Sequence, residues 1–315
     1  MKIAVIGAGG VGGYFGGRLA KANFDVTFLA RGEHLREIQQ NGLRVKSING
    51  DFIIENQQAT DSIQKIGFAD IVILATKAWQ VCDISRELRS ILKKDTIVLP
   101  LQNGVLTAEE LAENIPSANI IGGLCKIISK VESPGVINHF ALDPVVIFGE
   151  FDSRGTERAE LLKSVFDRAE VNAIISDEIA ADLWKKFIAI CVSGLLAVTR
   201  TNYGELRELK ETRQLMTELI REIFTLSQHL QINIEPEFPD RLISLIDTYP
   251  YETTSSLTRD VWDGRPSEIE YQNGTVVRLG EKYGVATPVN RFVYSCILPM
   301  EIKARNKMTE GNGRN

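Results

Sequence analysis

Residues 2–12 decide the fold, and they read Lys2-Ile3-Ala4-Val5-Ile6-Gly7-Ala8-Gly9-Gly10-Val11-Gly12. A short apolar run is followed at once by the pattern G-x-G-x-x-G, and residues 12–22 then have helical spacing. In this setting the first glycine permits a tight turn, the second admits a pyrophosphate and the third lets the helix approach the strand. The N-terminus of the helix adds unpaired N–H groups and the positive end of its dipole. We therefore predict a dinucleotide site rather than a plain glycine turn, with these candidate cofactor residues: Gly7, Ala8, Gly9, Gly10, Val11 and Gly12.

The rest of the first half alternates apolar runs with amphipathic segments. Runs at 25–30, 71–76 and 96–101 lack strict polar alternation, which is typical of parallel strands buried on both faces. Segments 12–22, 34–41 and 83–92 have helical spacing and suit crossover connections. Two further strands are expected at 136–140 and 145–149.

Beyond residue 176 the pattern is helical almost to the end. One helical stripe is expected from seven apolar residues at intervals of three and four: Leu206, Leu209, Met216, Leu219, Ile220, Ile223 and Phe224. We expect an α/β protein in which a Rossmann-type dinucleotide-binding domain, residues 1–176, precedes an all-helical C-terminal domain, residues 177–315.

Composition narrows the class of function. The chain has 315 residues, a formal net charge of -5 and 44% hydrophobic residues, which excludes a disordered chain and argues against nucleic acid as a partner. The four cysteines form no Cys-x-x-Cys pair, and the three histidines show no metal-ligand spacing, so no metal is expected. The longest apolar stretch, 187–198, is too short to span a bilayer. A soluble cytoplasmic protein with no membrane partner is expected.

The end of the second strand distinguishes the two nicotinamide dinucleotides. Chains that bind NAD usually carry Asp or Glu there, whereas Phe28-Leu29-Ala30 leads here into Arg31, which can pair with a 2′-phosphate. NADP is therefore the expected cofactor. The alternative is that Arg31 is a solvated loop residue and that Glu33 takes the acidic role.

Blocks along nearly the whole chain resemble the ketopantoate reductases, also called 2-dehydropantoate 2-reductases. The resemblance implies NADPH-dependent reduction of ketopantoate to (R)-pantoate, a step towards pantothenate and coenzyme A, with the active site in the cleft between the two domains. The matching blocks, besides 7–16 and 29–31, are Lys77-Ala78-Trp79-Gln80-Val81, Gln102-Asn103-Gly104, Ser133-Pro134-Gly135-Val136 with His139, Leu183-Trp184-Lys185-Lys186, Ser255-Ser256 and Glu268-Ile269-Glu270-Tyr271-Gln272-Asn273-Gly274.

Two catalytic residues follow from this resemblance. Lys186 matches the family's catalytic lysine, although a Lys-Lys pair on a helix is by itself usually a solvated face. Hydride arriving at a carbonyl carbon leaves negative charge on oxygen, which a positioned ammonium can stabilise and protonate. Glu268 matches the acidic active-site residue, where it would accept a hydrogen bond from the product hydroxyl, bind substrate and hold Lys186; otherwise it is an exposed carboxylate near a helix start.

Three more residues are implied to contact cofactor or substrate. Asn103 would lie beside nicotinamide and substrate, although Asn-Gly often marks only a turn. Lys77 would lie beside the cofactor phosphates or the substrate, or is solvated. Ser256 would bind the substrate carboxylate, or caps a helix.

The chain departs from the family pattern four and eight residues after Lys186. Well-characterised members carry asparagines there that contact substrate, whereas this chain has Ile190 and Gly194. We expect a less polar pocket and an altered substrate preference. The alternatives to ketopantoate reduction are a related reductase of another branched 2-oxo acid and a non-catalytic NADP-binding redox sensor. A homodimer and a monomer are both compatible with the sequence.

Overall fold

The computed structural model describes residues 1–55, 57–152 and 155–312, with side chains described as far as residue 308. The chain folds into two compact units, each with most of its contacts within itself. The first comprises Met1–Gln102 and Leu106–Ile179, and the second comprises Asn103–Val105 and Ala180–Asn315. The main division therefore falls after residue 179 rather than 176, and a short segment around Asn103 groups with the second unit.

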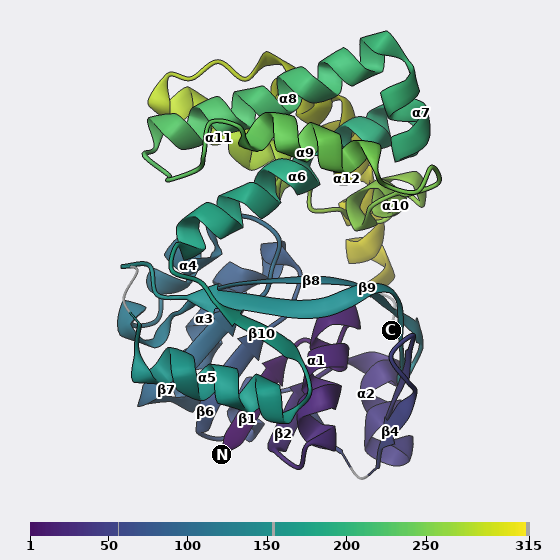
Figure 1. The fold of residues 1–315 in the computed structure, drawn as a ribbon. Coiled ribbons are helices and arrows are strands. Elements are labelled where there is room, and N and C mark those ends of the chain that lie inside the picture. The colour runs from purple at the N-terminus through teal and green to yellow at the C-terminus, as the bar shows by residue number, and fades with distance from the viewer. Residues whose placement is uncertain (56, 153–154, 313–315) are drawn as a thin grey trace. The chain divides into compact units, whose positions relative to one another are not determined.

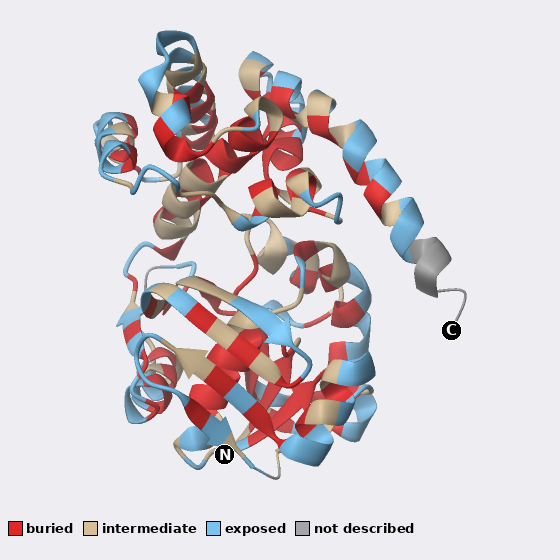
Figure 2. Ribbon diagram, turned by 90° about the vertical axis from the view of Figure 1, so that its right-hand side faces the viewer, coloured by how far each residue is buried: buried red, intermediate tan, exposed pale blue. Residues whose placement is uncertain are grey.

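A five-stranded parallel sheet forms the centre of the first unit (Figure 1). In β1, Ile3 and Val5 belong to the apolar cluster on one face, whereas Ala4 and Ile6 belong to the cluster on the other. Burial on both faces explains why these strands are continuous apolar runs in the sequence. Figure 2 colours the buried residues of the structure red. In spatial order the strands are β5 (Gln58–Thr60), β2 (Asp25–Leu29), β1 (Lys2–Ile6), β6 (Ala69–Leu74) and β7 (Leu92–Pro100).

Helices connect and cover this sheet. The α-helices of the first unit are α1 (Gly10–Lys21), α2 (Gly32–Asn41), α3 (Val81–Leu88), α4 (Thr107–Ala112) and α5 (Glu157–Arg168). Short 3₁₀ turns lie at Ile63–Lys65, Ala78–Gln80, Arg89–Ile91 and Ser117–Asn119. The Rossmann-type arrangement expected from the sequence is confirmed.

A second sheet was not expected in full. It consists of β10 (Asn172–Ile175), β9 (Val136–Gly149), β3 (Leu43–Ser47), β4 (Phe52–Ile54) and β8 (Gly122–Ser133), which pairs with β9. The prediction of separate strands at 136–140 and 145–149 is wrong, because β9 continues through both. The intervening Leu142 has φ +63°, and the pairing of β8 with β9 shifts register on either side of Ile128, so an irregularity replaces the expected turn.

Helix α1 lies between the two sheets. A Cβ added to Gly16 would come 2.5 Å from the ring of Phe28 in β2, and one added to Gly13 would come 2.6 Å from Ile137 in β9. Tyr14 contacts His139 of β9 at 4.9 Å between ring centroids. Helix α1 can fit between two sheets because its glycines leave room for both.

The second unit is helical, as expected. Its long helix α6 (Ile179–Thr199) is buried at every residue from 191 to 197. The predicted stripe 206–224 is divided between α7 and α8, and Leu209 between them is 58% exposed, so that residue does not belong to the buried face. The remaining helices are α7 (Tyr203–Glu208), α8 (Lys210–His229), α9 (Phe238–Asp247), α10 (Ser256–Trp262), α11 (Asn273–Tyr283) and α12 (Pro288–Asn312), with a 3₁₀ turn at Ile269–Tyr271.

Candidate active site

The glycine loop joins β1 to α1 and has the geometry that a dinucleotide requires. Gly7 has φ +102°, and the backbone N–H groups of Gly7 and Ala8 both donate to the carbonyl of Leu29 in β2. A Cβ on Gly12 would lie 2.0 Å from the carbonyl oxygen of Gly7, whereas one on Gly9 would meet no atom within 4 Å. The loop is thus closely packed beneath Gly12 and open above Gly9, so a phosphate can approach the backbone there.

The N-terminus of α1 has no side-chain cap. Gly9 occupies the N-cap position, so the first N–H groups of the helix have no side-chain acceptor. On its other side the loop is held by backbone packing, since a Cβ on Gly10 would lie 2.6 Å from the carbonyl oxygen of Ser129. A helix N-terminus whose N–H groups have no side-chain cap is suited to binding an anion.

His34 fixes the loop from α2. Its Nδ1 accepts from the backbone N–H of Gly135 at 3.0 Å, so the proton of the neutral ring is on Nε2, which donates to the carbonyl of Ala8 at 2.7 Å. Burial lowers the pKa of His34 below its usual value, while the bond to Ala8 acts in the opposite direction. The neutral imidazole therefore connects the glycine loop to the turn between β8 and β9. The sequence offered no sign of this role.

Arg31 lies at the carboxyl end of β2, where it is exposed and precedes the first turn of α2. Among the described residues it has no ion-pair partner, so its guanidinium is available for a ligand anion. Glu33 lies in the first turn of the same helix. The choice between a 2′-phosphate on Arg31 and a ribose on Glu33 therefore stays a prediction.

Lys77 follows β6 and precedes the 3₁₀ turn Ala78–Gln80. Its Nζ lies 5.6 Å from the ring centroid of Trp79, and its backbone N–H donates to Gln80 Oε1. The side chain is at the edge of the parallel sheet where the strands end, which is where ligands bind in such sheets.

Buried polar side chains without partners border this same edge. Within the described part of the first unit, Thr76 Oγ1, Ser129 Oγ and both polar atoms of Gln102 are buried and accept or donate no hydrogen bond. Each such atom costs about 1–3 kcal/mol if nothing satisfies it. Thr76 and Ser129 lie against Gly7 and Gly10 of the glycine loop, and Gln102 follows β7, two strands away from β1. These positions fit a bound dinucleotide, and none of the three residues was predicted from the sequence. Their place after β6, after β7 and in β8 was the available signal.

In the second unit, the paired lysines of α6 have different environments. Lys185 Nζ lies 2.7 Å from Glu235 Oε2 and 5.9 Å from the ring centroid of Phe238. Lys186 is half-buried, and it has no ion-pair partner among the residues that the structure describes. The expected hold of Glu268 on Lys186 stays a prediction. An ammonium without a counter-ion remains able to bind a substrate anion.

Asn103 and Glu268 come together within the second unit, although 165 positions separate them. Asn103 Nδ2 donates to Glu268 Oε2 at 3.0 Å, and the Glu268 side chain is only 6% exposed. Gly104 has φ +119°, and a Cβ there would lie 3.3 Å from the carbonyl oxygen of Tyr271. The glycine thus allows the Asn103 segment to lie against the turn that carries Glu268.

The loop before Glu268 is held from α12 by a buried charge. Glu301, 3% exposed, accepts from the backbone N–H of Ser267 at 2.8 Å and from its hydroxyl at 2.7 Å. The other oxygen of Glu301 lies 2.6 Å from Arg305 Nε, and Arg305 also donates to the carbonyl of Ser267. We call Ser267, Glu301 and Arg305 the Ser267 clamp; it constrains the residue next to Glu268.

The remaining positions that the sequence analysis linked to substrate, 256 and 194, differ in exposure and packing. Ser256 is exposed at the start of α10, and the helix cap is its neighbour Ser255, whose hydroxyl accepts from Thr258 N–H at 3.1 Å. Gly194 is buried, and a Cβ there would lie 2.4 Å from Asn273 Oδ1 and 2.7 Å from Val293. Position 194 is therefore closely packed against Asn273 and Val293, with no room for a longer side chain in this arrangement. The expected less polar pocket stays a prediction.

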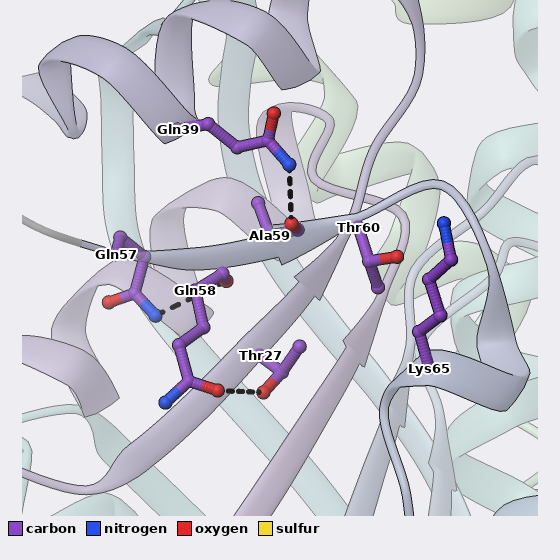
Figure 3. A pocket seen from close by; sticks show the side chains of 7 residues that line it. All are labelled: Thr27, Gln39, Gln57, Gln58, Ala59, Thr60 and Lys65. Atoms are coloured by element: carbon purple, nitrogen blue, oxygen red, sulfur yellow. Dashed lines mark hydrogen bonds between the residues drawn. The ribbon is translucent and has the colours of Figure 1, made fainter.

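A separate polar hollow lies at the β5 edge of the parallel sheet (Figure 3). It has a volume of about 470 Å³, and its amides already bond locally: Gln39 donates to the Ala59 carbonyl at 2.8 Å. None of the predicted site residues lines it. The lining residues are Thr27, Gln39, Gln57, Gln58, Ala59, Thr60 and Lys65.

The described residues contain neither a candidate membrane span nor a candidate metal cluster. No helix among them is long and apolar enough to cross a membrane. No group of three or more His, Cys, Asp or Glu side chains among them could hold a metal ion.

Known proteins resemble the chain over nearly its whole length. The family model described as ketopantoate reductase PanE/ApbA matches residues 3–153, and the model for its C-terminal part matches residues 178–301. A 2-dehydropantoate 2-reductase of Nostoc sp. is 31% identical over 300 residues, covering 93% of each chain. An uncharacterized oxidoreductase, YkpB, of Bacillus subtilis is 29% identical, covering 94% of this chain and 97% of that protein.

A solved structure that is similar in fold is named as a different dehydrogenase rather than as a ketopantoate reductase. A ternary structure of D-mandelate dehydrogenase with NADH and anilino(oxo)acetate has a TM-score of 0.87 and 26% identity, covering 97% of this chain and 99% of that one.

Proposed function

This chain belongs to the ketopantoate reductase family of oxidoreductases, and we propose that it catalyses the NADPH-dependent reduction of ketopantoate to (R)-pantoate. The observation that carries the proposal is the contrast on α6: Lys185 is paired with Glu235, while Lys186 has no ion-pair partner among the described residues. A lone ammonium on a buried helix is suited to an anionic substrate and to the charge that develops on its carbonyl oxygen.

The residues have distinct roles in the proposed reaction. When bound, the reduced nicotinamide supplies a hydride to the keto carbon. Lys186 Nζ donates a proton to the carbonyl oxygen as that oxygen takes up negative charge. Glu268 accepts a hydrogen bond from the resulting hydroxyl, and Asn103 holds one Glu268 oxygen in place at 3.0 Å. Ser256 binds the substrate carboxylate.

The first unit holds the cofactor in this proposal. The uncapped N-terminus of α1 binds the pyrophosphate, with Gly9 leaving space for it. Arg31 pairs with the 2′-phosphate, which supports NADPH over NADH, and Lys77 adds positive charge at the same edge of the sheet. If Glu33 instead binds an unphosphorylated ribose, NADH is the better cofactor.

A second candidate is a reductase of another 2-oxo acid. It is favoured by Ile190, half-buried one turn after Lys186, and by the filled position 194. Loss of hydrogen-bonding groups from a site changes which hydroxylated substrates it selects. The similarity to a D-mandelate dehydrogenase supports an apolar 2-oxo acid as the class.

One experiment separates these functions. The purified protein is tested against a panel that includes ketopantoate, 2-oxoisovalerate and phenylglyoxylate, with NADPH and NADH in parallel. The highest kcat/KM with ketopantoate and NADPH would support the first proposal. A higher value for another acid would replace it with the second, and no turnover of any acid, despite tight NADPH binding, would favour a redox sensor.

A further inference from the structure

Gln102 lies at the edge of the parallel sheet where the strands end, and its side-chain amide is buried without a hydrogen-bond partner among the described residues. It is 6% exposed, and neither its Oε1 nor its Nε2 has a hydrogen-bond partner among the described residues. A buried amide with both functions unmet indicates a ligand that offers a donor and an acceptor together. A phosphate or carboxylate, which only accepts, leaves the Gln102 oxygen unsatisfied.

Strand order places Gln102 on a particular side of the sheet. Gln102 follows β7 (Leu92–Pro100), and the preceding residue, Leu101, donates its N–H to the carbonyl of Leu74 at the end of β6. Arg31 follows β2, on the other side of β1. Because neighbouring strands are about 4.8 Å apart, β7 lies roughly 10 Å from β1, in the direction away from Arg31.

This separation matches the two halves of a dinucleotide that crosses the sheet edge. A 2′-phosphate at Arg31 and a pyrophosphate at the α1 N-terminus put the second nucleotide over β6 and β7. Thr76, which follows β6 and has a buried hydroxyl without a partner, lies in the same direction. The group in that half with an amide donor and acceptor is the carboxamide of the nicotinamide ring.

We propose that Gln102 binds this carboxamide, its Oε1 accepting from the carboxamide N–H and its Nε2 donating to the carboxamide oxygen. The inference rests on the proposed function for the presence of the dinucleotide, and it deepens that proposal by assigning a residue that orients the nicotinamide ring. Fixing the carboxamide restricts rotation of the ring and so determines which face is presented to the substrate.

Binding measurements test this assignment without turnover. The dissociation constants of NADP⁺ and of 3-acetylpyridine adenine dinucleotide phosphate, in which a methyl group replaces the amide nitrogen, are measured by titration calorimetry on the full chain. The wild type is expected to bind NADP⁺ roughly threefold to tenfold more tightly. Gln102→Leu should reduce this preference to near unity. Gln40→Leu, at an exposed position of α2, is the matched control and should keep it.

A second variant shows whether weaker binding results from the lost contact or from misfolding. Gln102→Glu retains the shape and an acceptor but has no donor, so it should bind NADP⁺ more weakly than the wild type while keeping a preference over the acetyl analogue. It should also bind nicotinic acid adenine dinucleotide phosphate at least about tenfold more weakly than the wild type does, because two carboxylates would then meet.

The outcomes separate the two proposals. A wild-type preference that persists unchanged in Gln102→Leu would overturn the assignment while leaving NADPH-dependent reduction intact. An absence of NADP⁺ binding by the wild type would overturn the proposed function and this inference with it.

Discussion

The glycine loop of the first unit and the Glu268 region of the second are built on opposite principles. The loop is a contiguous backbone structure, and its features come from side chains that are missing at Gly7, Gly9 and Gly12. The Glu268 region is assembled from side chains of separate segments, namely Asn103, Ser267, Glu301 and Arg305. A backbone site fails when volume is added, whereas an assembled site fails when one polar partner is removed.

The largest expected effect tests the assembled region. Lys186→Ala should lower kcat by about 10²–10⁴-fold, because it removes the proposed general acid, and it should leave the dissociation constant of NADP⁺ unchanged. Lys185→Ala is the matched control, since Lys185 is already paired with Glu235. Steady-state kinetics and calorimetry measure both. Equal losses in the two variants would remove Lys186 from the mechanism.

The next effect tests the glycine loop with two of its glycines, Gly9 and Gly12, which differ in packing. Gly12→Ala introduces a Cβ 2.0 Å from a carbonyl oxygen and should lower the unfolding free energy by about 1–3 kcal/mol while weakening NADP⁺ binding. Gly9→Ala meets open space, so stability should change by less than about 0.5 kcal/mol while NADP⁺ affinity still falls. Chemical denaturation and calorimetry distinguish them. Unchanged NADP⁺ affinity in Gly9→Ala would contradict the loop as the phosphate site.

A smaller effect concerns the Ser267 clamp. Glu301→Gln removes the charge that accepts two hydrogen bonds from Ser267. We expect kcat to fall by a few fold with little change in KM. We also expect the unfolding free energy to fall by about 1–2 kcal/mol. Glu281→Gln is the control, because Glu281 forms an exposed pair with Arg291. Loss of stability without any change in kcat would make the clamp purely structural.

The smallest effect is a pH dependence at His34. Because burial lowers its folded-state pKa, neutral His34 stabilises the fold fully above its unfolded pKa of about 6.5. That stabilisation is lost as pH falls through the lowered pKa, when Nδ1 can no longer accept from Gly135. The unfolding free energy of the wild type should therefore drop more between pH 7.5 and 5 than that of His34→Gln. Parallel pH curves for the two proteins would disprove the role.

The same contrast explains what the sequence could and could not predict. The parallel sheet was predictable because strands buried on both faces leave apolar runs such as 71–76, and the glycine loop because it is contiguous. The second sheet was predicted only in part. Its strand β3 is short and partly polar, and β4 has only three residues, so neither leaves a clear pattern. Strand β9 was predicted as two strands because its pattern is irregular around Leu142. The bond between Asn103 and Glu268 has no local signature, since only folding brings those segments together.

The position of α1 between two sheets has a consequence for its dynamics. Unwinding the first half of this helix requires separation from Ile137 at Gly13 and from Phe28 at Gly16. Amide hydrogens along α1 should thus exchange with solvent only in rare, global unfolding events, unlike those of helices covered on a single face. An anion arriving at its N-terminus would find the donors already immobile, so association would carry little entropic penalty there.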